Sequence, residues 1–383
     1  MNEEGARRIA AQTLLDIRDG LLSGSIGPVP RIAVTGPGSE HGEETVLAGA
    51  AAAARAGGVK VLYIGTRSAP EVTAVPAKDA EEAHAVMERL LESGEADGAV
   101  TMHYPFPIGV ATVGLLKAPA TGRDIWLATT TGTADTDRVA AMVKGAVYGV
   151  AAARCGGVPD PTLGILNVEG ARAAETALKK LAANGWKVRF GSSGRADGGC
   201  ILRGNDVLTG SCDVIVCDSL TGNVLAKLLS AFTSGGDTET VGSGYGPGVG
   251  PGFGRIVCIV SRASGAPVIA GAVACAAKMA GAKLPDFAAR ELAAAEKAGL
   301  SELVKRAKPA AEAADVPVPP KEVVAAQITG VEVTDLEDAV RLLWAAGIYA
   351  ESGMGCTGPV VRVSEEKLEK ARGILRGKEY IGG

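Results

Sequence analysis

The chain has 383 residues and a net charge of −4, and 47% of its residues are hydrophobic but only 4% aromatic. The charge and the lack of a basic cluster argue against binding of nucleic acid. No apolar run has the roughly 20 residues of a membrane span, and the first residues do not resemble a signal peptide. The length and the 53 glycines predict a large α/β body, in which small residues let helices pack closely on a sheet, plus an appendage.

The cysteines indicate the compartment. They are seven in number and widely spaced, which predicts free thiols in a reducing cytoplasm and not a disulfide framework. Cys212 and Cys217 lack C-x-x-C spacing, and the chain has only three histidines, so we expect no metal site.

Taken in chain order, the first 25 residues have the apolar spacing of an amphipathic helix. Its apolar face is marked by Ile9, Leu14, Leu15, Ile17, Leu21 and Leu22.

A glycine-rich loop follows the first predicted strand, residues 31–34, and precedes a helix over 43–56 and another strand. This unit is a weak nucleotide-binding signal, because it lacks a full G-x-G-x-x-G motif and a Walker lysine. Gly36, Gly38 and His41 are candidates for an anion site. His41 is either a general base or, more simply, a polar loop residue.

Alternating strands and helices continue along the body, which is typical of a sheet with helices on both faces. The periodicity predicts helices over 80–92, 136–155, 171–183, 267–280 and 288–297, and strands over 59–64, 98–101, 125–128, 162–167 and 187–190.

A central stretch runs over residues 213–265, and its first half has the strand, turn and helix order that is typical of an anion site. A β-branched strand ends at Asp218, a turn is predicted at Gly222 and Asn223, and an apolar helix over 224–232 carries Lys227 in its first turn. The first backbone N–H groups of a helix have no partner within the helix, so they can bind an anion.

The second half repeats this arrangement. A glycine-rich loop over 242–254 leads into a strand over 256–260, which is followed by Ser261 and Arg262. We expect Asp218 and Ser261 at the carboxyl ends of neighbouring strands, where they form one cleft for an oxyanion. Taken singly, each of these residues is as well explained by a turn or a solvated helix face.

The composition predicts three regions: a body over 1–305, a Pro/Ala-rich linker over 306–320, and a small α+β domain over 321–383. In the last region we expect a strand over 323–333, a helix over 336–346, a strand over 348–363 that glycines interrupt, and a helix over 365–375.

Cys356 lies in that interruption, among three glycines and a proline. Backbone N–H groups in such a turn can lower the pKa of a thiol and bind the oxyanion of a thioester. Cys356 is therefore a candidate nucleophile, and the alternative is a cysteine placed incidentally in a hairpin loop.

Two segments, TGNVLAK at 221–227 and VGPGFGRIVCIVSRAS at 249–264, resemble the phosphotransacetylase superfamily and the PlsX-type phosphate acyltransferases. The resemblance covers residues 30–280. It implies a Rossmann-like three-layer sandwich of the isopropylmalate dehydrogenase-like type and an enzyme that makes acyl phosphates. Residues 102–107 depart from the Gly-Asn-Thr-Gly loop of that family, which argues against a fatty acyl carrier as substrate.

Residues 218–224, 244–250 and 355–359 also resemble the alpha subunits of component C of glycine/sarcosine/betaine reductase. That resemblance implies a phosphate acetyltransferase subunit in which Cys356 carries an acetyl thioester and inorganic phosphate releases acetyl phosphate. The partners it implies are the ketoacyl-synthase-like component C beta subunit and selenoprotein A, in a homo- or hetero-oligomer. It implies no bound cofactor, only phosphate as a substrate.

On this interpretation Cys356 is the nucleophile. The groups assigned to phosphate and substrate are Gly222, Asn223, Lys227, Ser261, Arg262, Gly36, Gly38, His41 and Asp218.

Two alternatives remain. One is a phosphate acyltransferase that uses a coenzyme A or carrier-protein thioester without a covalent cysteine intermediate. The other is a non-catalytic partner subunit. The sequence leaves open whether glycine, sarcosine or betaine is reduced, the oligomeric state, and whether His41 or the segment around His103 takes part in the chemistry.

Overall fold

A computed structural model describes residues 29–194, 198–305, 316–331, 335–355, 358–378 and 380–381, together with Arg7, Thr13, Leu14, Ile17 and Arg18. Most of the predicted N-terminal helix, residues 306–315 of the predicted linker, and Cys356 therefore lie outside the described residues.

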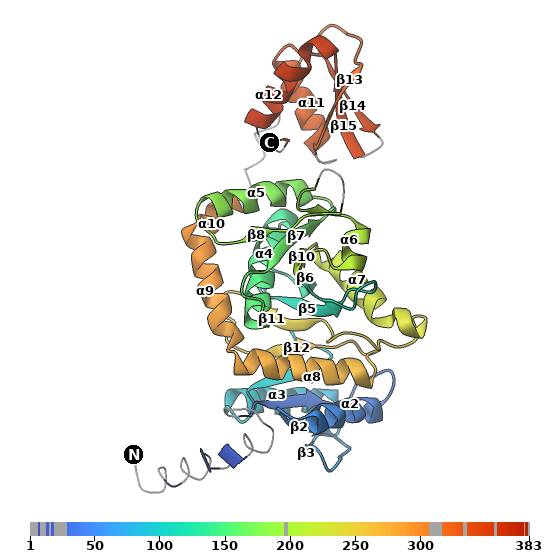
Figure 1. The fold of residues 1–383 in the computed structure, drawn as a ribbon, viewed down its shortest axis with the longest axis vertical. Helices are drawn as coiled ribbons and strands as arrows, with labels where there is room; N and C mark the ends of the chain where they lie inside the picture. Colours follow the sequence, from blue (N-terminus) through green and yellow to red (C-terminus); the bar gives the residue numbers. More distant parts are fainter. Residues whose placement is uncertain are drawn as a thin grey trace.

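The body is built on one 12-stranded mixed sheet (Figure 1). Its order is β3 (Thr73–Pro76), β2 (Lys60–Gly65), β1 (Arg31–Thr35), β4 (Gly98–Thr101), β12 (Val257–Ile259), β11 (Gly246–Val249), β5 (Ala111–Lys117), β6 (Asp124–Gly132), β10 (Val214–Val216), β7 (Thr162–Leu166) and β8 (Arg189–Phe190), with β9 (Ile201–Leu202) also paired to β7.

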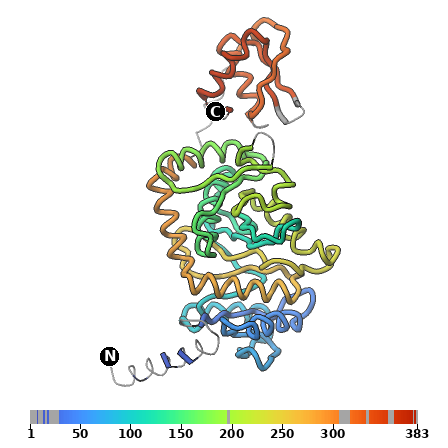
Figure 2. Tube along the Cα trace, viewed as in Figure 1, coloured from blue at the N-terminus to red at the C-terminus, as the bar shows by residue number. Residues whose placement is uncertain are grey.

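Strand direction changes in the middle of the sheet. The first five strands of this order, β3, β2, β1, β4 and β12, are parallel to one another. β12 comes from late in the chain and pairs with β4 from its first third (Figure 2). From β12 the next three pairings, through β11 and β5 to β6, are antiparallel. β10 then pairs parallel to β6. The carboxyl ends of β12 and β10 therefore point to opposite edges of the sheet.

Helices cover both faces, as Figure 1 shows. They are α2 (Glu43–Ala56), α3 (Ala80–Glu92), α4 (Arg138–Cys155), α5 (Ala171–Ala183), α6 (Gly204–Thr209), α7 (Ser219–Ala231), α8 (Ala266–Gly281), α9 (Leu284–Lys297) and α10 (Leu300–Leu303), with a 3₁₀ turn η1 (Phe232–Ser234).

Alternate residues of β1 show the two faces. Ile32 and Val34 are buried in the cluster that α2, α4 and α8 share, whereas Ala33 is buried in the cluster with α3. Period-two alternation between two apolar clusters means that both faces of the strand are covered. This confirms the three-layer α/β sandwich that the sequence predicts.

Small residues set the spacing between the layers. α4 is almost wholly buried and begins at the N-cap Asp137, whose side chain accepts from the Ala140 N–H. A Cβ added at Gly149 would lie 2.5 Å from Val214 Cγ1 on the sheet. Among the described residues no single helix is both long and apolar enough to cross a membrane; α8 and α9 meet that test only as a pair bent by 67°.

The C-terminal residues form a second, three-stranded sheet with its own buried cluster. Its elements are β13 (Ala326–Thr329), α11 (Leu336–Ala345), β14 (Ala350–Gly355), β15 (Gly358–Val363), a 3₁₀ turn η3 (Glu365–Lys367) and α12 (Leu368–Gly377).

β14 and β15 pair antiparallel with Gly355 opposite Gly358. The predicted strand over 348–363 is thus a hairpin of two strands, because the glycine-rich run lets the chain reverse. The division of the chain into a body, a linker and a small domain stays a prediction.

Candidate functional site

The helix after β10 begins earlier than the sequence predicts. α7 starts at Ser219, and its N-cap Asp218 accepts from the Thr221 N–H at 3.1 Å and from Thr221 Oγ1 at 2.6 Å. The Gly222 N–H donates to the Asp218 carbonyl at 2.9 Å. The predicted turn at Gly222 and Asn223 is therefore wrong, since both residues lie inside the helix.

Because α7 starts at Ser219, the anion site expected at Gly222 and Asn223 is not at the N-terminus of a helix. Partial burial opposes ionisation of Asp218, but hydrogen bonds from Thr221 and the charge of Arg138 lower its pKa below the ordinary value. A carboxylate thus already occupies the N-terminus of α7, where its charge suits the helix dipole. The backbone at this point is not an open phosphate site.

Gly222 has a packing role. A Cβ at Gly222 would lie 1.9 Å from the Thr129 carbonyl oxygen, so α7 approaches β6 more closely than any side chain allows. Asn223 donates from Nδ2 to the Thr130 carbonyl at 3.2 Å, which fixes its side chain on the same strand.

Lys227 joins the two halves of the predicted site. It lies two turns along α7 from Asp218, and its Nζ is 3.5 Å from Ser261 Oγ, which follows β12. The same Nζ is 3.9 Å from Glu239 Oε1 and 5.4 Å from the centre of the Tyr245 ring. Its side chain keeps 53% exposure, so the ammonium remains accessible.

Asp218 does not lie with Lys227 and Ser261 in the way expected. β10 and β12 are not neighbours, because β11, β5 and β6 lie between them. Their carboxyl ends point to opposite edges, so the prediction that Asp218 and Ser261 follow adjacent strands is wrong. α7 instead returns along the sheet and brings Lys227 to Ser261.

A buried carboxylate, Glu239, organises the turn after β12. It is only 3% exposed and accepts from Tyr245 OH and from Ser264 Oγ, both at 2.7 Å. Ser264 Oγ in turn accepts from the Ser261 N–H at 3.0 Å. Burial, together with the charge of Glu239, raises the pKa of Tyr245, which therefore stays a neutral donor. Sequence reasoning missed Glu239, because a single acid in a Gly/Thr-rich loop has no spacing signal.

The loop after β1 packs on the same turn. The Glu40 N–H donates to the Arg262 carbonyl at 2.8 Å, and His41 Nε2 lies 3.2 Å from the Ala263 carbonyl. A carbonyl only accepts, so Nε2 carries the proton in this contact and Nδ1 is the nitrogen that can act as a base. The structure thus brings the loop of His41 to the turn of Ser261.

The two loop glycines have different surroundings. Gly36 donates its N–H to the Ile64 carbonyl at 2.8 Å, and a Cβ on it would lie 2.3 Å from Tyr63 OH. Gly38 has φ +108°, which favours glycine, and lies near Met102. Gly36 therefore serves packing, and its N–H is not an anion donor.

Arg262 is exposed at the tip of the turn. Its carbonyl accepts from Glu40 N–H, while its guanidinium has no partner among the described residues. Lys227 contacts Ser261, and Arg262 is the next residue of the turn. A guanidinium and an ammonium are both suited to an anion such as phosphate.

The segment that departs from the PlsX-type loop packs inward. Tyr104, Phe106 and Phe253 form an aromatic cluster with ring centres 4.9 to 6.3 Å apart. Arg255 donates to Tyr104 OH at 3.1 Å. His103 is exposed, and its carbonyl accepts from Thr101 Oγ1, so no contact on the described residues connects it to Lys227 or Ser261.

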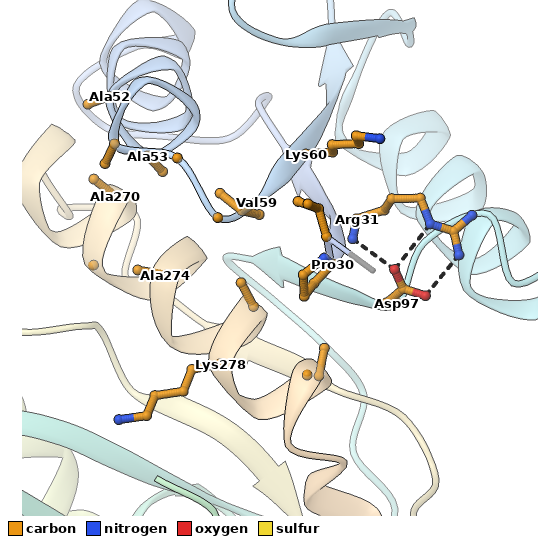
Figure 3. A pocket seen from close by; sticks show the side chains of 18 of the residues that line it. Pro30, Arg31, Ala52, Ala53, Val59, Lys60, Asp97, Ala270, Ala274 and Lys278 are labelled. Atoms are coloured by element: carbon orange, nitrogen blue, oxygen red, sulfur yellow. Dashed lines mark hydrogen bonds and ion pairs between the residues drawn. The ribbon is translucent and has the colours of Figure 1, made fainter. Parts of the chain in front are cut away.

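A cavity of about 1160 Å³ lies elsewhere, between α2 and α8 (Figure 3). It is lined by Arg31 and Lys60, which begin β1 and β2. The cavity is thus at the amino ends of these strands, whereas Ser261 follows the carboxyl end of the parallel strand β12. We place the candidate site at Lys227 and Ser261, because charged and hydroxyl groups converge there.

The thiols are mostly inaccessible. Six cysteines are described, and all six are free and buried: Cys155, Cys200, Cys212, Cys217, Cys258 and Cys275. Burial raises the pKa of Cys155 and of Cys200 to about 12 and also raises the pKa of Cys217. The candidate nucleophile Cys356 lies outside the described residues.

The chain is similar to known proteins in sequence and in fold. Residues 30–197 match the family model described as fatty acid synthesis protein. The phosphate acyltransferase of Thermobifida fusca (strain YX) is 30% identical over 242 residues, which are 52% of this chain and 65% of that protein. In fold, the chain is similar to EutD phosphotransacetylase from Staphylococcus aureus, with a TM-score of 0.45 and 14% identity over 68% of this chain and 98% of that one.

The body is an α/β sandwich, and part of its sequence is similar to a phosphate acyltransferase. A more extensive likeness is to the glycine/sarcosine/betaine reductase complex component C subunit alpha of Peptoclostridium acidaminophilum, with 48% identity over 375 residues, 97% of each chain. The chain belongs to the family of these component C alpha subunits.

Gly222→Ala tests the packing of α7 on β6. The new methyl group cannot fit against the Thr129 carbonyl, so we expect the variant to lose about 2 kcal/mol or more of unfolding free energy. Gly373→Ala is the matched control, since Gly373 lies in a helix with no atom within 4 Å of the added Cβ; we expect it to gain about 0.5–1 kcal/mol. Urea unfolding followed by circular dichroism measures both, and equal stability of the two variants would contradict this packing.

Glu239→Ala tests the organising role of the buried carboxylate. The change leaves Tyr245 OH and Ser264 Oγ without their acceptor, so we expect a loss of about 2–3 kcal/mol in the same unfolding assay. Asp237→Ala removes an exposed acid from the same loop and should cost less than about 0.5 kcal/mol. If both substitutions cost the same, Glu239 does not organise this turn.

Proposed function

We propose that this chain is the phosphate acetyltransferase subunit of a glycine, sarcosine or betaine reductase complex. Cys356 carries the acetyl group as a thioester, and inorganic phosphate releases it as acetyl phosphate. The family of the chain and the phosphate acyltransferase relative support the reaction class.

The observation that carries the proposal is the contact between Lys227 Nζ and Ser261 Oγ, in a turn whose next residue is the exposed Arg262. An ammonium from α7 meets a hydroxyl from the turn after β12, and the same turn carries the exposed Arg262. Phosphate has the charge and the acceptor oxygens that such a group binds. Lys227 acts as a point charge, and Arg262 offers a bidentate fork.

The chemistry follows from the thioester. A phosphate oxygen attacks the carbonyl carbon, a C–O bond forms, and the tetrahedral intermediate collapses as the C–S bond breaks. The thiolate of Cys356 leaves with the electron pair and later takes up a proton, while phosphate loses one. Nδ1 of His41 is the candidate acceptor of that proton. Proximity and charge stabilisation are what the protein supplies.

The other thiols are unsuited to carrying the acyl group. A nucleophilic thiol must be reached by its donor and be deprotonated often enough. The six described cysteines are buried, and burial raises the pKa of at least Cys155, Cys200 and Cys217. The seventh, Cys356, follows Gly355, where β14 ends.

The partners we propose are the component C beta subunit and selenoprotein A, consistent with the name of the relative as a subunit of a complex. α7 and its C-cap residue expose four large apolar side chains at intervals of four residues. They are Leu220, Val224, Leu228 and Phe232. A row of this kind on a helix is typical of a surface that another subunit covers.

The phosphate acyltransferase relative favours a second candidate, in which a coenzyme A or carrier-protein thioester is used directly and Cys356 is structural. Acetyl phosphate formation by Cys356→Ala separates the two: loss supports the covalent route, and retention supports the direct one.

Arg262→Lys tests the phosphate site. Lysine keeps the charge but loses the fork, so we expect the KM for phosphate to rise about tenfold while acylation of Cys356 changes less than about twofold. Steady-state kinetics and single-turnover acylation measure the two steps. Equal loss in both would show that Arg262 serves the fold or the acyl group.

Alkylation tests the difference between the thiols. Under native conditions at neutral pH, iodoacetamide should modify Cys356 before the six buried cysteines, because buried thiols are both shielded and protonated. Peptide mapping at increasing times measures the order. Early modification of Cys217 or Cys258 would contradict the assignment, and denatured protein is the control for intrinsic reactivity.

A further inference from the structure

The cavity between α2 and α8 is an open groove with a floor of small residues. Its floor comes from Ala52, Ala53, Ala270, Ala274 and Ala277 (Figure 3). The two helices touch near Gly49, where a Cβ would lie 2.7 Å from Ile269, and the groove opens beyond that contact. We call it the alanine groove.

The alanine groove is separate from the candidate active site. It contains Arg31 and Lys60 at the amino ends of β1 and β2. Ser261 follows the carboxyl end of β12, which is parallel to these strands through β4. An occupant of the groove therefore leaves Lys227 and Ser261 open.

The chain enters the described body at the edge of this groove, since Val29 and Pro30 line it. Residues 1–25, before them in the chain, have the apolar spacing of an amphipathic helix, with Leu14, Ile17 and Leu21 on one face. Leu14 is 68% exposed and Ile17 is 54% exposed. Within one copy, then, these two apolar side chains are exposed, and the groove is open among the described residues.

We propose that the alanine groove receives residues 9–22 of a second copy of this chain. A floor of alanines lets a helix with leucine and isoleucine side chains come close, as in helix-in-groove recognition. The exchange is reciprocal, so a two-fold dimer forms two such contacts. Lys278 and Lys283 line the groove, and Asp16 and Asp19 in the segment offer opposite charges.

A disulfide between copies tests the occupant. Ile17→Cys is combined with Ala274→Cys in a Cys356→Ser background, so that the remaining thiols are buried ones. After mild oxidation we expect a band of twice the chain mass on a non-reducing gel, reversed by reductant. The matched control is Gln12→Cys with Ala274→Cys, because Gln12 falls on the opposite face of the predicted helix; it should give roughly tenfold less of that band.

Each other outcome overturns the proposal. A disulfide that forms within one chain would mean that the groove binds its own N-terminal segment. Equal cross-linking of the Ile17 and Gln12 variants, or none in either, would mean that residues 9–22 do not occupy the groove.

Light scattering of the full chain gives an independent measurement. Leu14→Glu with Ile17→Glu should raise the dimer dissociation constant roughly a hundredfold, and Ala274→Arg should do the same from the groove side. Gln12→Glu, on the opposite face of the predicted helix, and Ala289→Arg, on an exposed position of α9, should leave it unchanged. A monomeric wild-type chain, or a dimer that none of these changes weakens, contradicts the proposal.

Discussion

The site depends on one arrangement: the Lys227 ammonium near both Ser261 Oγ and the buried carboxylate of Glu239. Glu239 fixes Tyr245 and Ser264 from inside the protein, and Ser264 fixes the start of the turn that carries Arg262. A buried carboxylate is stable only when it is paired and hydrogen-bonded. Its partners are therefore held in place, next to the Lys227 ammonium and in the turn that carries the exposed Arg262.

The sheet makes this arrangement possible through its change of direction. Three antiparallel pairings separate β12 from β6, so α7 runs back toward the end of β12 and does not start there. Gly222 lets α7 lie directly against β6. The phosphate candidates thus come from the middle of one helix and from one turn, and the N-terminus of α7 is closed by its own Asp218.

Local elements were predictable, and long-range order was not. The bounds of α2, α3 and α5 match the predicted helices. Apolar periodicity and flanking glycines are local signals, and they predict where a single helix begins and ends. The predicted start of α7 was wrong because Asp218, four residues before Gly222, caps the helix by accepting from the Thr221 N–H. Which strands neighbour each other depends on contacts across the whole chain, so Asp218 was wrongly placed beside Ser261. The sequence motifs predicted that Lys227 and Ser261 belong to one site, but no motif predicted the organising role of Glu239.

The central claim is that Cys356 carries the acyl group between a donor and phosphate. The most direct measurement is incubation of the full chain with isotopically labelled acetyl phosphate, followed by peptide mass spectrometry without reductant, because the thioester step runs in reverse. The account predicts one labelled acetyl group, on Cys356, and none in Cys356→Ser. Label on another cysteine, or on none while acetyl phosphate is still formed in the forward direction, would contradict it.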